Sequence, residues 1–114
     1  MRPINSNQEM CCDDVIKYIY NLNLLDIEVY KKLCKTKELR ANELAKLINK
    51  ERSTVYRSLQ RLSSCGLCKK KTNTLKKGGY YHTYIAVNKK YIKKDLEKCI
   101  EEWSQKMKKT LGEL

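Results

Sequence analysis

Apolar side chains recur every three or four positions in five segments of the chain, which predicts five helices. The expected helices cover 13–22, 26–34, 42–48, 52–64 and 89–111. Asp26 is the expected N-cap of the second helix and Asn42 that of the third, while Gly66 is placed to end the fourth. The expected apolar face of the third helix consists of Leu44, Ala45, Leu47 and Ile48. A tight break at 49–51 separates the third and fourth helices, which is the spacing of a helix-turn-helix.

After Gly66 the hydrophobic period changes from that of a helix to that of a strand. Residues 67–72 are compatible with one strand, and the aromatic and β-branched residues at 80–87 predict a second. The segment at 73–79 is rich in turn residues, so the strands should form a hairpin with Lys76 and Lys77 at its tip. The sequence therefore predicts a mostly α fold with a small β-hairpin, which is a winged helix-turn-helix with a long C-terminal helix.

The length of 114 residues fits one domain with an appended helix. We expect a flexible N-terminal segment at 1–12, a winged helix-turn-helix DNA-binding domain at 13–88 and a C-terminal dimerisation helix at 89–114. The apolar stripe of the last helix spans nearly 30 Å at about 1.5 Å per residue, which is long for a small domain to cover alone. Its expected dimer contacts are Ile92, Leu96, Cys99, Ile100, Trp103, Met107 and Leu111. Trp103 is the expected buried anchor, and the helix at 13–22 is a second candidate for the interface. The alternative is that the stripe packs back on its own domain.

Positive charge is concentrated in one segment. From Arg52 to Lys94 the sequence has twelve Lys and Arg residues and no Asp or Glu. The whole chain has 25 basic and 13 acidic residues, so the remainder is balanced and the net charge of +12 comes from this segment. Such segregation indicates a surface that meets a polyanion, with nucleic acid favoured and a membrane surface the weaker candidate.

Donor-rich side chains occupy the face of the helix at 52–64 that lies opposite its apolar stripe. Ser and Thr near a helix start suit phosphate oxygens, because free backbone N–H groups lie beside them. Arg57 can bond a guanine edge and Gln60 an adenine edge, and hairpin lysines suit backbone phosphates. The alternative is a merely solvated face with a solubilising turn, but the sequence of this face has no carboxylate to balance its three arginines. The candidate DNA contacts are Arg52, Ser53, Thr54, Tyr56, Arg57, Gln60, Arg61, Lys70, Lys76 and Lys77.

The string Arg-Ser-Thr-Val-Tyr-Arg-Ser-Leu at 52–59, then Gly66-Leu67, then Gly79-Tyr-Tyr-His-Thr-Tyr-Ile-Ala-Val, resembles the archaeal TrmB-type winged-helix transcription regulators. The broader MarR and ArsR groups share that fold. The resemblance covers about 25–111 and implies a dimer on a roughly palindromic operator, with the helix at 52–64 in the major groove. It assigns the DNA contacts to Ser53, Thr54, Tyr56 and Arg57. Arg40-Ala41 departs from the Thr cap that is common in the family, and the chain stops after one long helix where larger members carry a sugar-binding domain. No sugar effector is therefore implied.

Cysteines offer a second possible chemistry. The six thiols are Cys11, Cys12, Cys34, Cys65, Cys68 and Cys99. The N-terminus lacks a signal-peptide pattern, so a disulfide framework is not the default. The lone Cys65-Gly-Leu-Cys68 lacks the four ligands of a structural zinc site, although Cys11-Cys12 or His82 could complete one. We expect ordinary half-buried thiols and no metal or other cofactor, with metal or redox sensing as the alternative.

Catalytic patterns are absent from the sequence, because His82 is the only histidine and no paired-carboxylate site or phosphate-binding loop occurs. An enzyme is not expected. No apolar run approaches the roughly 20 residues that span a bilayer, so a cytoplasmic location is expected. We therefore expect a homodimeric, sequence-specific transcription regulator of double-stranded DNA. The alternatives are a non-specific chromatin or architectural DNA-binding protein, a cysteine-based metal- or redox-responsive regulator, and a winged domain that binds protein or RNA.

Overall fold

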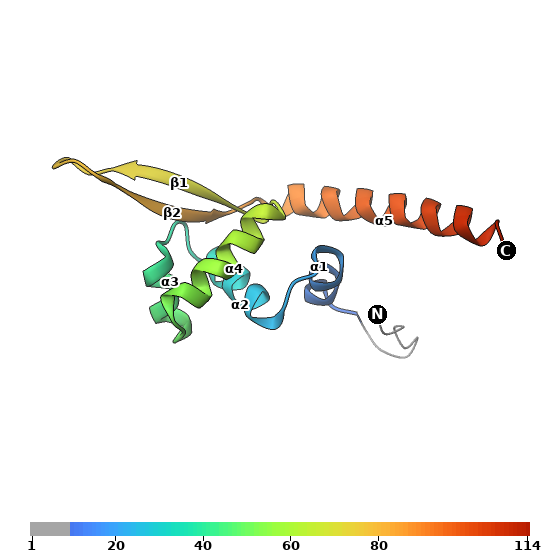
Figure 1. The fold of residues 1–114 in the computed structure, drawn as a ribbon, viewed down its shortest axis with the longest axis horizontal. Helices are drawn as coiled ribbons and strands as arrows, with labels where there is room; N and C mark the ends of the chain where they lie inside the picture. The colour runs from blue at the N-terminus through green and yellow to red at the C-terminus, as the bar shows by residue number, and fades with distance from the viewer. Residues whose placement is uncertain (1–9) are drawn as a thin grey trace.

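The computed structural model describes residues 10–114, which form five helices and one two-stranded sheet (Figure 1). The elements are α1 (Cys12–Tyr20), α2 (Leu24–Lys35), α3 (Ala41–Ile48), α4 (Arg52–Ser64), β1 (Cys68–Thr74), β2 (Tyr80–Ala86) and α5 (Lys89–Leu111). The predicted mostly α winged helix-turn-helix is confirmed. The flexible segment predicted at 1–12 lies outside the described residues up to residue 9, and Cys12 already belongs to α1. None of the helices in the described part has the length and apolar character needed to cross a bilayer.

The start of α2 differs from the prediction. Asn23 is the N-cap, and its Oδ1 accepts a hydrogen bond from the Asp26 backbone N–H at 2.8 Å. Asp26 lies three residues further on, and its Oδ2 accepts from the Asn23 backbone N–H at 3.1 Å. These reciprocal bonds form a capping box. The prediction of Asp26 as N-cap was therefore wrong, and its carboxylate is free to make additional contacts from inside the helix.

The helix α3 also begins earlier than predicted. Arg40 occupies the N-cap position, and the Glu43 Oε1 accepts a hydrogen bond from the Arg40 backbone N–H at 2.9 Å. Asn42 lies inside the first turn, so its prediction as N-cap was wrong. Leu47 was predicted on the apolar face but is 54% exposed, because the helix buries the side that carries Ala41, Leu44 and Ile48.

Residues with left-handed backbone end α3 and α4. Asn49 has φ 59° after α3, and Gly66 has φ 81° after α4, as predicted for that glycine. Behind α4 the Leu67 N–H donates to the Leu62 carbonyl at 2.9 Å, and the Gly66 N–H donates to the Ser63 carbonyl at 3.1 Å. This is a Schellman motif, which satisfies the last carbonyls of the helix. It turns the buried Leu67 into the core and starts the hairpin.

The hairpin is longer than predicted. β1 and β2 pair antiparallel from Cys68 opposite Ala86 to Thr74 opposite Tyr80, so β1 extends two residues beyond the predicted end. Only 75–79 remain as the turn, in which the Gly78 N–H donates to the Leu75 carbonyl at 3.1 Å. Gly78 and Gly79 both have positive φ, which residues with a Cβ rarely adopt.

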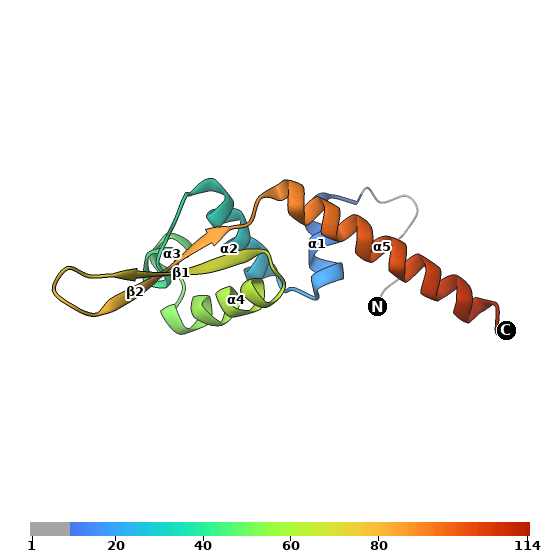
Figure 2. The same ribbon diagram turned by 90° about the horizontal axis from the view of Figure 1, so that it is seen from above.

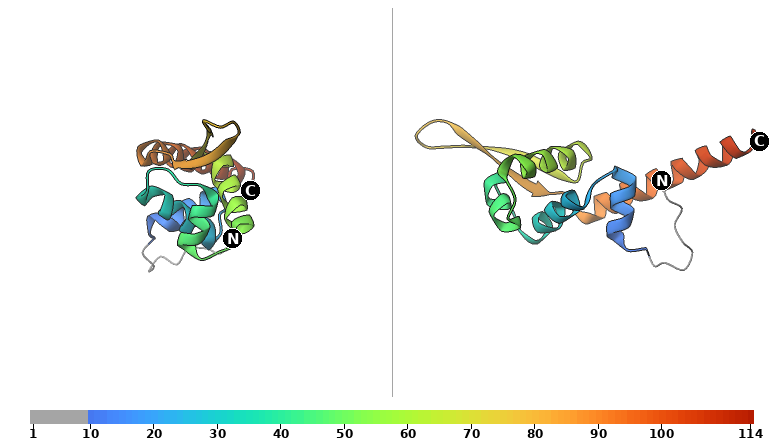
Figure 3. Two further views of the ribbon diagram at one scale, coloured as in Figure 1. Left: turned by 90° about the vertical axis from the view of Figure 1, so that its left-hand side faces the viewer. Right: turned by 60° about the horizontal axis from the view of Figure 1, so that its bottom comes forward.

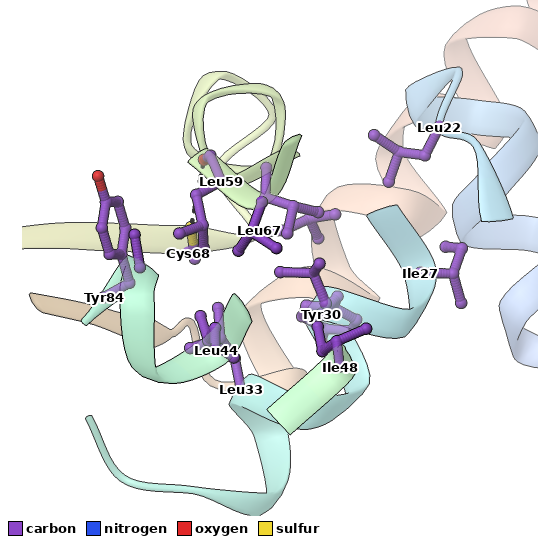
Figure 4. Packing of buried hydrophobic residues seen from close by; sticks show 14 of the residues in the cluster. Leu22, Ile27, Tyr30, Leu33, Leu44, Ile48, Leu59, Leu67, Cys68 and Tyr84 are labelled. Carbon is purple, nitrogen blue, oxygen red and sulfur yellow. Dashed lines mark hydrogen bonds between the residues drawn. The ribbon is translucent and has the colours of Figure 1, made fainter. Parts of the chain in front are cut away.

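The core lies between α2, α3, α4 and the base of the hairpin (Figure 4). Its fully buried apolar side chains are Val29, Leu33, Leu44, Val55, Leu59, Leu62 and Leu67. Each contributes about 1.5–3 kcal/mol by leaving water. Ile92, at 5% exposed, also belongs to this core and joins α5 to its own domain. The predicted contact of Ile92 with a second copy stays a prediction.

The β1–β2 hairpin, which is the wing of the fold, and the helix α5 extend from opposite ends of the helical body (Figures 2 and 3). The molecule has extents of 65 × 25 × 23 Å. The helix α1 packs beside the base of α5, where the Tyr20 hydroxyl donates to Asp95 Oδ2 at 2.6 Å. No side chain of α1 is fully buried, and beyond Ile92 none of α5 is. The two ends of the molecule are thus more exposed than its centre.

Candidate nucleic-acid interface

The recognition-helix candidate α4 has one buried and one exposed face. Its buried side chains are Val55, Ser58, Leu59 and Leu62. At about 3.6 residues per turn, the opposite side carries a row of exposed polar residues. That row consists of Ser53, Arg57, Gln60 and Ser64. Its first three members are candidate DNA contacts, and Ser64 was not among the predicted ones.

Two edges flank this row. Arg52 and Tyr56 form the edge toward the wing, close to Tyr84 of β2. Burial raises the pKa of Tyr84. The neighbouring Tyr56 also raises that pKa, while Arg52 lowers it. Thr54 and Arg61 form the other edge, toward α2. The predicted contacts on α4 therefore divide into a central row and two edges with different neighbours.

A buried carboxylate fixes the α2 edge. Asp26 is 0% exposed, and its Oδ1 accepts from the Ser58 hydroxyl at 2.5 Å and from Arg61 Nη2 at 2.8 Å. Arg61 Nε donates to Asp26 Oδ2 at 3.0 Å, which makes the ion pair bidentate. Asp26 thus clamps α4 against α2 and supplies the carboxylate that the local sequence of this face lacks.

The ionisation of Asp26 depends on this clamp. Burial alone would raise the pKa of Asp26, but hydrogen bonds from Arg61, Ser58 and the Asn23 backbone outweigh it and lower the pKa below its ordinary value. Arg61, predicted as a DNA contact, therefore has a positioning role within the protein. Its side chain remains 43% exposed, so contact with phosphate from its outer edge stays a prediction.

The three lysines of β1 point in different directions. Lys70 is opposite Tyr84 in the register and shares its face, which is the face toward α4. Lys69 and Lys71 lie on the other face. Lys71 Nζ is 3.7 Å from Glu38 Oε1. Only Lys70 of the three therefore lies on the face of Tyr84, toward the edge of α4 that carries Arg52 and Tyr56, and its role as a DNA contact stays a prediction.

The segment between α2 and α3 braces the wing. The Leu39 N–H donates to the Tyr84 carbonyl at 3.2 Å, and the Tyr84 N–H donates to the Leu39 carbonyl at 2.8 Å. The Thr83 hydroxyl donates to Glu38 Oε2 at 2.7 Å. The Arg40 guanidinium lies 3.7 Å above the centre of the Tyr81 ring. These contacts fix the angle of the hairpin relative to the helical body.

Beyond the brace, the wing is exposed and basic. Lys76 and Lys77 lie in the turn that the two glycines close, and both are exposed. Tyr80, next to the turn, is 68% exposed and its ring is 5.4 Å from that of His82. The tip thus presents two lysines at the far end of the molecule from α5. By contrast, Lys89 lies beside the C-terminal end of α2, in a hollow with Thr36 and Lys37.

The cysteines between α4 and β1 are held in ordinary packing. Cys65 Sγ lies 3.8 Å from the Tyr20 carbonyl, and Cys68 Sγ lies 3.2 Å from the Ser63 hydroxyl. Burial raises the pKa of both thiols, which disfavours the reactive thiolate. Across residues 10–114 no three His, Cys, Asp or Glu side chains are grouped so that they could hold a metal ion.

Asp26, Glu38 and Thr83 are the residues that sequence reasoning missed. Asp26 and Glu38 pair with Arg61 and Lys71, which belong to the acid-free segment. The fold therefore supplies this segment with counter-charges from α2 and from the residues that follow it. Arg57 differs, because within residues 10–114 no acidic side chain lies within salt-bridge distance of it.

The helix-turn-helix, the braced basic wing and the polar row on α4 define a winged-helix DNA-binding protein. The family described as sugar-specific transcriptional regulator TrmB matches residues 16–90, more than half of the chain. The chain therefore belongs to the TrmB family and is a DNA-binding transcription regulator, as the sequence predicted. Family and fold both point to regulation of transcription rather than to catalysis.

Two curated relatives come from Methanocaldococcus jannaschii. The uncharacterized protein MJ1503 is 37% identical over 102 residues, which is 90% of this chain and 77% of the relative. The uncharacterized protein MJ1082 is 32% identical over 108 residues, which is 95% of this chain and 89% of the relative. The similarity thus includes α5 as well as the winged domain.

Solved structures are similar over the same length. A possible transcriptional regulator from Methanosarcina mazei Go1 is 26% identical with a TM-score of 0.83, over 97% of this chain and 94% of that one. TrmBL2, described as an archaeal chromatin protein with a novel mode of DNA binding, is 24% identical with a TM-score of 0.59. That likeness covers 88% of this chain and 35% of TrmBL2, and it shows a shared fold.

Proposed function

We propose that this protein is a homodimeric, sequence-specific transcription regulator with α4 in the major groove and the wing on the phosphate backbone. The observation that carries the proposal is the exposed row of Ser53, Arg57 and Gln60 on a helix whose back is clamped. Arg57 is suited to a bidentate contact with guanine and Gln60 to one with adenine. A fixed helix supports such contacts, because hydrogen bonds to base edges require defined donor positions.

The other contacts fit backbone binding. Ser53 and Thr54 lie in the first turn of α4, where free N–H groups favour a phosphate oxygen. Lys70, Lys76 and Lys77 extend the positive surface along the wing, and Arg52 and Tyr56 join the two elements. In this arrangement the central row gives base preference, while the wing supplies affinity that depends on salt but not on sequence.

The homodimer is supported by the uncovered apolar side of α5. Trp103 is 44% exposed, Met107 is 59% exposed and Leu111 is 63% exposed. A soluble chain rarely leaves such a continuous stripe in water, and a second copy covers it symmetrically. Two recognition helices in one dimer would then contact two half-sites separated by about one helical turn of DNA or a multiple of it.

Selection of bound duplexes from a random pool tests this proposal. We expect an enriched palindrome with two half-sites. Equal recovery of all duplexes would instead favour a non-specific architectural protein, a function that the basic wing alone would also support. Competition of an RNA duplex against DNA in the same binding assay tests the alternative that the winged domain binds RNA. Displacement by RNA at equal concentration would contradict DNA as the target.

A further inference from the structure

A hollow of about 340 Å³ lies between the C-terminal half of α4 and the turn that joins α1 to α2. Arg57, Gln60 and Ser64 line it from the exposed row of α4, and Arg61 lines it from the α2 edge. The turn at 20–22 forms the opposite wall. This volume is at the lower end of the range of small-ligand sites, which is about 300–1,000 Å³. The hollow can therefore hold one small group, and it shares two residues with the proposed base contacts.

Hydrogen bonds fix the wall that the turn provides. Asn21 has φ 55°, and its backbone N–H donates to the Lys17 carbonyl, to which the Leu22 N–H also donates at 2.9 Å. The Cys65 thiol at the end of α4 donates to the Tyr20 carbonyl at 3.8 Å. Leu22 is buried, whereas Asn21 is exposed. The shape of the hollow is therefore preorganised, and Asn21 adds an amide to its rim.

The hollow carries uncompensated positive charge. No Asp or Glu of residues 10–114 lines it, and Arg57 has no acidic side chain within salt-bridge distance among those residues. Arg61 uses Nε and Nη2 for Asp26, and its Nη1 has no hydrogen-bond partner within the described part of the chain. Because a guanidinium has five N–H donors in a planar fork, the outer edge of Arg61 can still bind an oxyanion.

The position of the hollow indicates which oxyanion it meets. The tip of the wing lies toward the N-terminal end of α4, whereas the α1–α2 turn lies beside its C-terminal half (Figures 1 and 2). A helix with its side chains is about 10–12 Å across and the major groove is about 12 Å wide, so elements that flank a helix in the groove face the phosphate rows. DNA that contacts Arg57 and Gln60 also covers the hollow, because both residues line it.

We propose that the hollow binds a phosphate group, and that a backbone phosphate of DNA occupies it while the wing contacts the other strand. The inference rests on the proposed function and adds a second backbone contact to it. The outer edge of Arg61 and the amide of Asn21 bind the phosphate oxygens, and Arg57 adds positive charge. Asp26 then has a second role, because it holds the Arg61 guanidinium at the rim of the hollow. Contacts with both strands fix the register of the polar row in the groove.

Two substitutions place a carboxylate in the hollow from opposite walls. Asn21→Asp changes the turn, where aspartate also tolerates left-handed backbone, and Ser64→Asp changes α4. Gln105→Glu is the matched control, because it makes the same change in net charge at an exposed position of α5. Fluorescence anisotropy measures the affinity for a labelled duplex of mixed sequence from about 50 to 200 mM salt. We expect each hollow variant to bind roughly tenfold more weakly than the control, with a salt slope reduced by about 1.

A second measurement identifies the source of the phosphate. Inorganic phosphate is titrated into the wild-type protein at constant ionic strength, and the backbone amide signals of Asn21 and Ser64 are followed by NMR. Hollow variants that bind DNA as the Gln105→Glu protein does would overturn the proposal. Saturable shifts with inorganic phosphate would in that case assign the hollow to a free anion, and unchanged signals would leave it without a phosphate function.

Failure of this proposal can be told apart from failure of the proposed function. Thermal unfolding first confirms that each variant is folded at the temperature of the assay. A wild-type protein that binds no duplex at any salt concentration would contradict the proposed function. A wild-type protein that binds DNA, with hollow variants equal to the control, would contradict only the phosphate contact in the hollow.

Discussion

The helices α4 and α5 both expose a regular row of side chains. The two rows differ in polarity and in how firmly the rest of the domain holds the helix that carries them. The row on α4 is polar, and the back of the helix is fixed by Leu59, Leu62 and the Asp26 clamp. The row on α5 is apolar, and only Ile92 at its beginning is buried. A fixed polar row is suited to hydrogen bonds with a ligand of defined geometry. An apolar row without cover is the surface that the proposed homodimer would bury.

The largest expected effect comes from the apolar row. Trp103→Glu places a charge in the exposed apolar stripe of α5 that the proposed homodimer would bury, so we expect a monomer by sedimentation. Simultaneous contact with two half-sites is then lost, and operator affinity should fall by about 100-fold or more. Gln105→Glu is the matched control, because it adds the same charge on the opposite side of α5. A Trp103→Glu dimer with normal affinity would contradict the account of α5.

Removing the clamp should change stability instead of assembly. Arg61→Met leaves Asp26 buried without its cation, so we expect a loss of about 3 kcal/mol in the free energy of unfolding. Arg57→Met, one turn away on the same helix, should cost less than about 0.5 kcal/mol because its side chain is exposed. Urea denaturation of both variants measures the difference. Equal losses would show that Arg61 is no more structural than Arg57.

Acid should weaken the same clamp. The pKa of Asp26 is lowered in the folded protein, so the ionised pair stabilises the fold fully above the ordinary Asp pKa of about 3.9. That contribution falls as the pH drops from there through the lowered folded pKa. Unfolding midpoints between pH 6 and pH 2.5 should therefore decline more steeply for the wild-type protein than for Asp26→Asn. Parallel curves would contradict this role of the Asp26 carboxylate.

The smallest expected effect concerns two lysines on opposite faces of the wing. Lys70 faces α4, whereas Lys71 is close to Glu38 on the other face. Lys70→Ala should reduce the slope of log affinity against log salt by about 1, as for one lost phosphate contact. Lys71→Ala should leave the slope nearly unchanged. The reverse order would mean that the wing presents its other face to DNA.

The sequence predicted α4 and α5 to the residue, because each has a strong apolar period and a clear boundary: Gly66 after α4, and the end of the strand-like segment before α5. It also placed the wing and its basic tip. The sequence did not predict the role of a residue whose main partner lies far away along the chain. Asp26 has a local position that suggested a cap, but its main partner Arg61 is 35 residues away, and only the packing of α2 on α4 brings them together.

The same limit explains the brace and the exposed leucine. Glu38 and Thr83 are 45 residues apart, so their hydrogen bond has no signature in local spacing. Leu47 is exposed because another side of the two-turn helix α3 packs against α4. The four apolar residues close together in this sequence do not determine which side is buried. Asn23 three residues before Asp26 does match a capping box, and this pattern could have corrected the start of α2.

Duplex selection with the wild-type protein and with Arg57→Ala tests most directly whether the fixed polar row on α4 contacts base edges. We predict that the variant still enriches a palindrome but loses preference at one base pair in each half-site. The expected cost is about 1–3 kcal/mol for the wild-type operator. An unchanged base preference in the Arg57→Ala protein would contradict the claim.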